Sequence, residues 1–408
     1  MNQKPRLVVI GNGMAGMRAV EELLKLAPDL YEITVFGAEP HGNYNRILLS
    51  PVLAGETTLD EIMLNSPAWY AAHNIRLHAG DPVVLIDRPS RQVVSASGRV
   101  VPYDRLLLAT GSRPFIIPVP GCELPGVVSF RDIQDVESML TAAHRGRRAV
   151  VIGGGLLGLE AATGRARQGM EVSVVHRVDS LMERQLDPAA AELLRAALAE
   201  RGLNFALAAE TDAILGDDHV RGIRLKDGRE IAADLVVMAV GIRPNITLAR
   251  AAGLHCERGI VVNDALQSFD PRIYAVGECV QHRQATYGLV APLWEQARVC
   301  ANHLAQLGYG KYLGSQVSTR LKVTGIDLFS AGEFNAAEGD EEIVFRDLRR
   351  GVYKKLVLRG NRIAGAVLYG DVADGSWYYE LMLKGADVSE IRDLLVFGKA
   401  FAETADAA

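Results

Sequence analysis

The chain has 408 residues, of which 49% are hydrophobic and 23% charged, so a globular protein is expected rather than a disordered one. This length exceeds what one hydrophobic core usually supports and indicates two or three domains. The formal net charge of −5 argues against nucleic acid and against an anionic membrane as the main partner.

The N-terminus and the hydropathy of the chain predict no targeting or membrane-spanning segment. The apolar run before Gly11 is too short for a signal peptide and already belongs to a strand. No stretch approaches the roughly 20 apolar residues of a membrane span. A cytoplasmic protein is therefore expected, with neither nucleic acid nor a membrane as its partner.

The four cysteines are widely scattered, at Cys122, Cys256, Cys279 and Cys300. They form no C-x-x-C pair, zinc site or iron–sulfur quartet, which favours their interpretation as small buried hydrophobic residues. We therefore expect no redox-active disulfide and no metal in this chain, so that electrons must leave from a cofactor.

The predicted elements begin with a βαβ unit. A strand over 6–10, a helix over 14–26 and a strand over 32–36 follow one another. A buried strand over 103–109 ends in the residues ATG. The segment 112–121 holds three prolines, which is typical of a connection between domains.

A second βαβ unit follows a helix near 132–143. It comprises a strand over 148–152, a helix from 156 to about 168 and a strand over 171–175. This repeated unit is the one internal duplication in the sequence.

Three further elements follow the second βαβ unit. A helix over 187–202 has Asp187 as its expected N-cap and Pro188 as its first residue. The Asp-Gly pair at 227–228 predicts a hairpin. The apolar run 234–241 predicts another buried strand.

The pattern changes toward the C-terminus. A short strand followed by a turn is predicted over 273–278, and a helix is expected to begin near Pro292. From about Val317, a hairpin over 355–371 with a Gly-Asn turn and a helix over 374–385 indicate a third domain of α+β type.

The first βαβ unit contains the pattern Gly-x-Gly-x-x-Gly, called here the first glycine loop. Gly11 makes the tight turn, Gly13 lets the backbone approach a pyrophosphate, and Gly16 lets the helix pack on the strand. The helix N-terminus faces the negative charge. Met14 and Ala15 lie within the loop and complete this part of the candidate site.

Glu39 follows the next strand at the offset where an acid commonly binds a ribose hydroxyl. The alternative for Glu39 is a solvated loop carboxylate, and the alternative for the glycines is an ordinary turn. The strand and the helix on either side of the loop favour dinucleotide binding.

The second βαβ unit carries the same pattern, called here the second glycine loop. Gly153, Gly155 and Gly158 repeat the three glycine roles, and Leu156 and Leu157 precede the last of them. Two such loops in one chain indicate that one holds FAD and that the other brings reducing equivalents from a nicotinamide.

The strand after the second glycine loop does not end in an acid. His176 and Arg177 lie where an acid would favour the free 2′-hydroxyl of NADH. An arginine can pair with a 2′-phosphate instead, which favours NADPH. In the alternative, His176 stacks on the adenine and Arg177 points to solvent, which allows NADH. These residues do not decide between NADH and NADPH as the coenzyme.

The chain resembles the two-dinucleotide-domain flavoprotein reductases in ATG at 109–111, in GGGLLGLE of the second glycine loop, in VGIRPN at 240–245 and in IYAVGE at 273–278. Within that group it is similar to the rubredoxin and ferredoxin reductases without a redox disulfide. More narrowly, it resembles the flavoprotein portion of assimilatory NAD(P)H nitrite reductase large subunits. That narrow resemblance covers nearly the whole chain and rests on GNGMAG, YNRILLS, GGGLLGLEAA, LMERQLD, GIRPN, GECV and YGLVAPLWEQA.

The resemblance implies an α/β fold of two Rossmann-like domains with a small C-terminal α+β domain. The NAD(P)H-binding domain, 114–242, would be inserted into a FAD-binding domain made of 1–113 and 243–312. The C-terminal domain, 315–408, would cover the flavin or form a protein interface.

The resemblance also implies roles around the FAD. The first glycine loop would bind the pyrophosphate and Glu39 the adenosine ribose, while Arg46 would approach the phosphates or the flavin edge. Val83 would touch the adenine through its backbone. The residues expected to cross under the FAD are Ala109, Thr110 and Gly111.

Two later motifs complete the implied FAD site. Gly277 precedes Glu278, which replaces the Asp common in the wider group and would accept a hydrogen bond from the ribityl chain. Pro292, Leu293 and Trp294 begin a helix whose N-terminus would face the flavin pyrimidine and stabilise negative charge there. The alternative for Trp294 is a core aromatic residue.

For the nicotinamide site, the resemblance places Glu160 near the nicotinamide ring, and a helix-surface charge is the alternative. Gly241, in the VGIRPN motif, is also assigned to the nucleotide sites. No residue is given a proton-transfer role, because hydride transfer needs proximity rather than a general acid or base.

The implied activity is that of a FAD enzyme that takes a hydride from NADH or NADPH and passes electrons to a separate redox protein. The expected acceptor is a component of nitrate or nitrite reductase. Rubredoxin or ferredoxin is the alternative acceptor, and a slow flavin redox sensor is an alternative of another class. No cysteine follows Cys300, so this chain is not expected to reduce nitrite unaided. Whether it forms a homodimer is left open.

Overall fold

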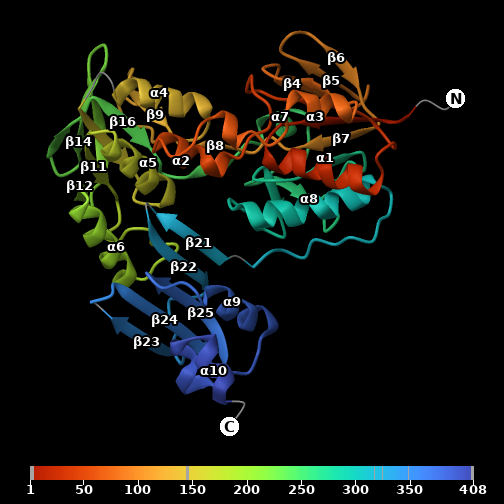
Figure 1. Ribbon diagram of the computed structural model, residues 1–408. Helices are drawn as coiled ribbons and strands as arrows, with labels where there is room; N and C mark the ends of the chain where they lie inside the picture. Colours follow the sequence, from red (N-terminus) through yellow and green to blue (C-terminus); the bar gives the residue numbers. More distant parts are fainter. Residues whose placement is uncertain (1–3, 144–146, 317, 324, 348, 406–408) are drawn as a thin grey trace. The chain divides into compact units, whose positions relative to one another are not determined.

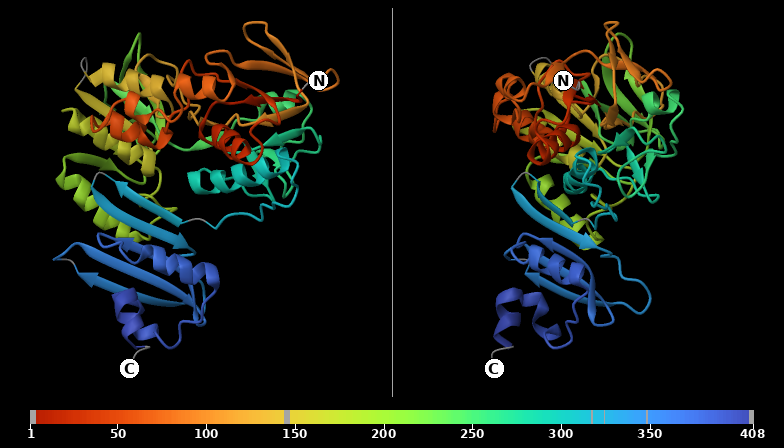
Figure 2. Two further views of the ribbon diagram at one scale, coloured as in Figure 1. Left: turned by 45° about the vertical axis from the view of Figure 1, so that its right-hand side comes forward. Right: turned by 90° about the vertical axis from the view of Figure 1, so that its right-hand side faces the viewer.

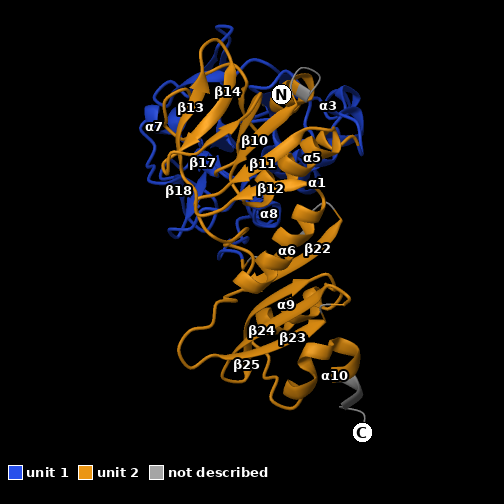
Figure 3. Cartoon of the chain, turned by 90° about the vertical axis from the view of Figure 1, so that its left-hand side faces the viewer, with its two compact units in different colours: residues 1–52, 56–115, 241–315 blue, residues 53–55, 116–240, 316–408 orange. Residues whose placement is uncertain are grey.

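The computed structural model describes residues 4–143, 147–316, 318–323, 325–347 and 349–405. The chain divides into two compact units, which Figure 3 shows in two colours. The first unit comprises Met1–Val52, Glu56–Phe115 and Gly241–Ser315, and the second comprises Leu53–Gly55, Ile116–Val240 and Gln316–Ala408. None of the helices in the described ranges is long and apolar enough to cross a membrane.

The first unit is built on a five-stranded parallel sheet (Figure 1). Strands β1 and β7 are almost continuous apolar runs because both of their faces are covered, and Leu7, Val8 and Val9 are inaccessible to solvent. In spatial order the strands are β19 (Ile273–Ala275), β7 (Arg105–Leu108), β1 (Arg6–Ile10), β2 (Glu32–Phe36) and β3 (Arg76–His78).

Two long helices of the first unit pack against each other, α1 (Met14–Leu26) and α8 (Val290–Leu304), as Figures 1 and 2 show. In α1, Met17, Val20 and Leu23 recur at helical spacing and are buried, which forms the apolar face that packs on the core. Strands β1 and β2 and helices α1 and α8 therefore contribute to one hydrophobic core in this unit.

Shorter elements surround this core. An antiparallel sheet contains β4 (Val83–Asp87), β5 (Gln92–Ser95) and β6 (Val100–Pro102). Two-stranded pairs are formed by β8 (Ser112–Pro114) with β17 (Ile242–Pro244) and by β18 (Ile260–Val262) with β20 (Val280–His282). The short helices are α2 (Leu49–Leu53), α3 (Pro67–Ala72), α7 (Thr247–Ala251) and the 3-10 turns Arg46–Leu48 and Asp60–Ile62.

The second unit repeats this plan in residues 116–240. Its parallel sheet contains β12 (Leu203–Ala206), β11 (Glu171–Val175), β10 (Arg148–Ile152), β16 (Leu235–Met238) and β9 (Val127–Ser129). A three-stranded antiparallel sheet contains β13 (Thr211–Gly216), β14 (Val220–Leu225) and β15 (Glu230–Ala232). The helices are α4 (Ile133–Ala143), α5 (Leu156–Arg167) and α6 (Pro188–Glu200).

The C-terminal part of the second unit is an antiparallel sheet with α9 packed on it (Figure 2). Its strands in spatial order are β21 (Ser318–Val323), β22 (Ile326–Gly332), β25 (Arg362–Tyr369), β24 (Val352–Arg359) and β23 (Glu341–Asp347). Helix α9 (Gly375–Lys384), the 3-10 turn Arg392–Phe397 and α10 (Lys399–Ala405) follow. Tyr378 of α9 is fully buried in the core between helix and sheet.

The predicted fold class is confirmed, with two α/β units on parallel sheets and a C-terminal α+β part. The helix expected to begin near Pro292 begins at Val290, as predicted. One local expectation needs correction, because the segment 112–121 contains β8 instead of being only a connection. Strand β8 forms because it pairs with β17, which is distant in sequence.

Candidate functional site

The first glycine loop lies between the end of β1 and the start of α1. Gly11 has a φ of +118°, and a Cβ placed on it would lie 2.6 Å from the carbonyl carbon of Ala109. A Cβ on Gly16 would lie 2.6 Å from the carbonyl oxygen of Gly11 and 2.9 Å from the Cβ of Ala109. Both positions require glycine, because the loop packs directly on the residue that follows β7.

Gly13 has different surroundings. A Cβ on Gly13 would meet no atom within 4 Å among the described residues, and its backbone is extended, with φ −86° and ψ −179°. Gly13 is also the N-cap of α1, whose first turn contains no acidic side chain. The space at Gly13, beside Met14 and Ala15 at the positive end of the helix, therefore fits a phosphate group.

The turn at Gly277 and Glu278 lies against the same loop. A Cβ on Gly277, which has a φ of +93°, would lie 2.9 Å from the Cβ of Ala15. The N–H of Gly277 donates to Oε1 of Gln296, a fully buried residue of α8, at 2.9 Å. The hydroxyl of Ser112 donates to Glu278 at 2.8 Å. The structure thus brings β19, α8 and the first glycine loop together.

Ala109, Thr110 and Gly111 follow β7 directly. The hydroxyl of Thr110 donates to the carbonyl oxygen of Asn245 at 2.7 Å, and the N–H of Asn245 donates to the carbonyl oxygen of Gly111 at 2.9 Å. Asn245 of the VGIRPN motif therefore holds this crossing segment in place.

Glu39 and Arg46 form an ion pair beside the first glycine loop. Arg46 donates to Oε1 of Glu39 at 2.6 Å, and the hydroxyl of Tyr44 donates to Oε2 at 2.6 Å. Burial lowers the pKa of Arg46, but Tyr44, Glu39 and Glu278 together raise it above its ordinary value. Tyr44 belongs to the YNRILLS motif, although no local pattern indicates that it orients Glu39.

The remaining predicted FAD residues lie on β4 and α8. Val83 is the buried first residue of β4. Pro292 and Leu293 are buried in the first turn of α8. Trp294 is 42% exposed, and the guanidinium of Arg18 lies 5.3 Å from its ring centroid, so the alternative of a core aromatic is wrong. Trp294 is exposed because it lies on the side of α8 that faces away from the core.

The second glycine loop repeats the geometry of the first. Gly153 has a φ of +124°, and its Cβ would lie 2.7 Å from the carbonyl carbon of Ala239. A Cβ on Gly158 would lie 2.9 Å from the carbonyl carbon of Gly153. Gly155, the N-cap of α5, would place a Cβ in space where the described chain has no atom within 4 Å. The open glycine again precedes the positive end of a helix.

His176 lies against this loop. The N–H of Gly154 donates to Nδ1 of His176 at 3.1 Å, and Nε2 lies 3.1 Å from Oε2 of Glu183. Arg177 is exposed. The sequence alone assigns no role to Glu183. The LMERQLD motif could have indicated it, because the motif places an acid soon after a strand that itself ends without an acid.

The other residues predicted for the nucleotide sites lie on α5 and in the turn before β17. Leu156, Leu157 and Glu160 lie in the first turns of α5, and the side chain of Leu157 is exposed. Gly241, with a φ of +113°, accepts a hydrogen bond from the N–H of Phe115 at 2.9 Å and belongs to the first unit.

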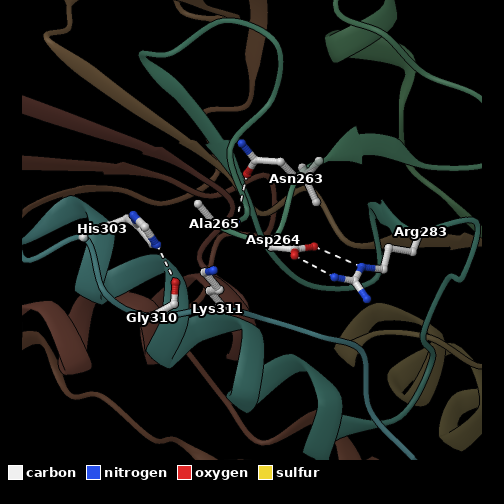
Figure 4. A pocket seen from close by; sticks show the side chains of 9 residues that line it. Asn263, Asp264, Ala265, Arg283, His303, Gly310 and Lys311 are labelled. Carbon is white, nitrogen blue, oxygen red and sulfur yellow. Dashed lines mark hydrogen bonds and ion pairs between the residues drawn. The ribbon is translucent and has the colours of Figure 1, made fainter.

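An open pocket of about 540 Å³ in the first unit is lined by none of these residues (Figure 4). Arg283 and Asp264 line it and pair with each other at 2.6 Å, so their charges offset one another. His303, which also lines it, binds the carbonyl oxygen of Gly310 at 2.7 Å. No three His, Cys, Asp or Glu side chains gather as metal ligands anywhere in the described ranges.

Two family descriptions match the chain. The family described as pyridine nucleotide-disulphide oxidoreductase matches residues 5–303. The family described as rubredoxin NAD+ reductase C-terminal domain matches residues 318–386.

Curated relatives are similar over most of the chain. Nitrite reductase [NAD(P)H] of Bacillus subtilis (strain 168) is 53% identical over 95% of this chain and 48% of the relative. The assimilatory nitrate reductase electron transfer subunit of the same strain is 47% identical over 95% of this chain and 50% of the relative. The chain spans about half the length of these curated relatives.

Solved structures are similar over the whole fold. The reductase of a covalent putidaredoxin reductase–putidaredoxin complex has a TM-score of 0.87 at 27% identity and covers 100% of both chains. A ferredoxin reductase from Rhodopseudomonas palustris has a TM-score of 0.85 at 26% identity and covers 96% of this chain and 100% of that chain.

Proposed function

We propose that this chain, which belongs to the pyridine nucleotide-disulphide oxidoreductase family, is a FAD-dependent NAD(P)H reductase that delivers electrons to a separate redox protein. The observation that carries the proposal is the pair of glycine loops. In each, one glycine, Gly13 or Gly155, leaves room for a phosphate at the start of a helix. The first loop would hold FAD and the second NADH or NADPH.

The residues of the first unit fit FAD. The space at Gly13 suits the pyrophosphate, and the carboxylate of Glu39, oriented by Tyr44 and Arg46, suits the adenosine ribose. Glu278, held by the hydroxyl of Ser112, suits a ribityl hydroxyl. When bound, FAD would supply the exchange between two-electron and one-electron chemistry.

The chain's own contribution is positioning and stabilisation of charge. The first turn of α8 would direct the positive end of the helix dipole toward the flavin pyrimidine. Ala109 to Gly111, held by Asn245, would support the cofactor from below. Glu160 would lie near the nicotinamide. We assign no residue to proton transfer, because the proposed step depends on proximity.

The domain division follows from the same proposal. We assign 1–113 and 243–312 to the FAD-binding domain, 114–242 to the NAD(P)H-binding domain and 315–408 to the C-terminal domain. The first two assignments are supported by two parallel sheets, in each of which one strand, β1 or β10, leads into a glycine loop. The match to a reductase C-terminal domain at 318–386 supports the third.

We propose a metal-containing component of assimilatory nitrate or nitrite reduction as the acceptor. The support is the similarity to a nitrite reductase and to a nitrate reductase electron transfer subunit, each about twice as long as this chain. The second candidate is a rubredoxin or ferredoxin reductase, which the C-terminal match and the two structural relatives favour.

The proposal can be tested by rapid anaerobic mixing of the FAD-reconstituted chain with NADH and with NADPH. Fast bleaching of the visible flavin band by either nucleotide is expected. Slow bleaching with a long-lived charge-transfer band would instead support a redox sensor. A chain that binds no flavin, or whose flavin neither nucleotide reduces, contradicts the proposal.

The acceptor is tested with the pre-reduced enzyme and equal concentrations of a rubredoxin, a ferredoxin and the metal-bearing component of a nitrite reductase. A preference for the last by about tenfold or more in second-order rate is expected. A higher rate with rubredoxin or ferredoxin would support the second candidate.

A further inference from the structure

The coenzyme preference of the second glycine loop depends on the charges at the end of β11. In a βαβ dinucleotide site, the adenosine ribose lies near the carboxyl end of the second strand. That strand is β11, and His176 is the residue that follows it. Since the strand ends without an acid, any carboxylate that faces this position must come from another segment.

The ring of His176 is neutral, and two hydrogen bonds hold its orientation. A backbone N–H can only donate, so Nδ1 of His176 accepts the hydrogen bond from Gly154. The ring proton is then on Nε2, which donates to Glu183 at 3.1 Å. The negative charge of Glu183 is therefore not cancelled by an imidazolium.

The loop between β11 and α6 holds Glu183 in this place. The N–H of Met182 donates to the carbonyl oxygen of Gly154 at 3.0 Å. Leu181 packs so closely that a Cβ on Gly154 would lie 2.8 Å from its Cδ2. Asp187 ends the loop as the N-cap of α6. The side chain of Glu183 remains 34% exposed and can accept a further hydrogen bond.

Arg177, the cation that follows His176 in the chain, interacts with a carboxylate of another segment. Its side chain is exposed, and it lies within electrostatic reach of Glu210. Lys226 lowers the pKa of Glu210 by a direct hydrogen bond, and Arg177 lowers it further. The charge of Arg177 is thus shared with a carboxylate on the following segment, whereas Glu183 is directed at the end of β11.

We propose that Glu183 makes the second glycine loop select NADH over NADPH, an inference that rests on the proposed function. Glu183 would accept a hydrogen bond from the free 2′-hydroxyl of NADH and would repel the 2′-phosphate of NADPH. The acid that usually ends the second strand is here supplied by the loop that follows.

The test is equilibrium binding of NAD+ and NADP+ to the full oxidised chain, measured by titration calorimetry. Wild-type protein should bind NAD+ about tenfold or more tightly than NADP+. Glu183→Gln retains an acceptor for His176 and removes only the charge, so the preference should fall by about tenfold. Glu183→Arg should shift the preference further toward NADP+. The matched control is Glu192→Gln, an exposed carboxylate of α6 paired with Arg195, which should not change the ratio.

The dependence of the NAD+ to NADP+ affinity ratio on salt concentration gives an independent test. Because the discrimination arises from charge repulsion, the ratio of wild-type affinities should fall as ionic strength rises, and that of Glu183→Gln should not. Equal binding of both nucleotides by wild-type protein, or an unchanged ratio in Glu183→Gln, overturns the inference alone. If neither nucleotide binds, the proposed function itself fails.

Discussion

Gly13 and Gly16 belong to one motif, yet their surroundings give them different roles. A side chain at Gly16 would overlap the carbonyl oxygen of Gly11, whereas a side chain at Gly13 would enter open space among the described residues. Gly16 is thus needed for the fold of the loop, and Gly13 for the space that the loop leaves. The same contrast separates Gly158 from Gly155 in the second glycine loop.

We expect Gly13→Val to yield a folded protein without bound flavin. The extended backbone at Gly13 accepts a β-branched residue, and the side chain would occupy the space proposed for the pyrophosphate. Flavin absorbance and the thermal midpoint of the apoprotein measure the two effects. Gly16→Val is the contrasting variant and should lose about 3 kcal/mol or more through overpacking. Flavin retained by Gly13→Val would contradict the assignment.

We expect Tyr44→Phe to weaken FAD binding by about tenfold, because a hydrogen bond to a charged group contributes about 1.5–3 kcal/mol. The variant removes the donor to Oε2 of Glu39 and leaves Arg46 in place. Fluorescence titration of the apoprotein with FAD measures the change. Tyr31→Phe, which removes a buried hydroxyl bound to the carbonyl oxygen of Leu304, is the control and should leave FAD affinity unchanged.

Within the second unit, the side chain of Asp187 connects helix α6 to strand β24. Asp187 accepts the N–H of Ala190 at 3.2 Å as the N-cap of α6, and its other oxygen accepts the hydroxyl of Tyr353 at 2.5 Å. Burial and the neighbouring carboxylate raise the pKa of Tyr353, so its hydroxyl stays protonated and donates. The C-terminal sheet is thus joined to α6 through a buried polar contact.

Asp187→Ala should lower the stability of the second unit by about 2–3 kcal/mol, since it removes both a helix cap and a buried acceptor. Tyr353→Phe should cost about 1 kcal/mol. Calorimetric unfolding of both variants and of the double variant measures the coupling. The double variant should cost less than the sum of the two, because both changes break one contact. Strict additivity would show that the two residues do not interact.

The connection between β18 and β20 should respond to acid. Arg283, and then His282, lower the pKa of Asp264 to about 2, from an ordinary value of 3.8. The folded-state pKa is thus below the unfolded one, so the contribution of Asp264 to stability is complete above about pH 4 and is lost as the pH falls toward 2.

Asp264→Asn should therefore lower the thermal midpoint at neutral pH, and its difference from wild type should shrink between about pH 4 and 2. Circular dichroism melts across this range measure the effect. Asp217→Asn removes a carboxylate whose side chain is 85% exposed, and it should show no such pH-dependent difference. A constant difference for Asp264→Asn would contradict the sign of the shift.

The whole chain repeats one plan and then adds a different one. Each unit contains a parallel sheet, a three-stranded antiparallel sheet and a glycine loop, and residues 318–405 add an antiparallel sheet with helices. Two nucleotide sites in one polypeptide suit a protein that receives electrons from one dinucleotide and holds them on another.

We expect the purified protein to contain about one FAD per chain and neither iron nor sirohaem. Flavin is measured by absorbance after release, and metal by mass spectrometry of the digested sample. Stoichiometric iron in the chain would contradict the proposal that the metal-containing acceptor is a separate protein.

Much of the fold can be predicted from local pattern. The strands over 6–10, 32–36, 148–152 and 171–175 have the expected bounds, because short and mostly apolar runs with a glycine close to one end leave few alternatives. The glycine spacing likewise indicates where helix, strand and phosphate meet, since those roles depend on a few consecutive residues. Strands such as β8 were not predicted as strands, because their pairing depends on distant partners.

The details of the sites depend on long-range packing. Gly277 reaches Ala15, Glu278 binds Ser112, and Asn245 binds the segment after β7, although these residues are far apart in the chain. Glu183 is close to His176 in sequence, but its direction is set by the packing of Leu181 and Met182 on Gly154. Residue types and their spacing determine that the chain has two nucleotide loops. Hydrogen bonds act over about 3 Å, so only the folded arrangement determines which carboxylate faces which nucleotide.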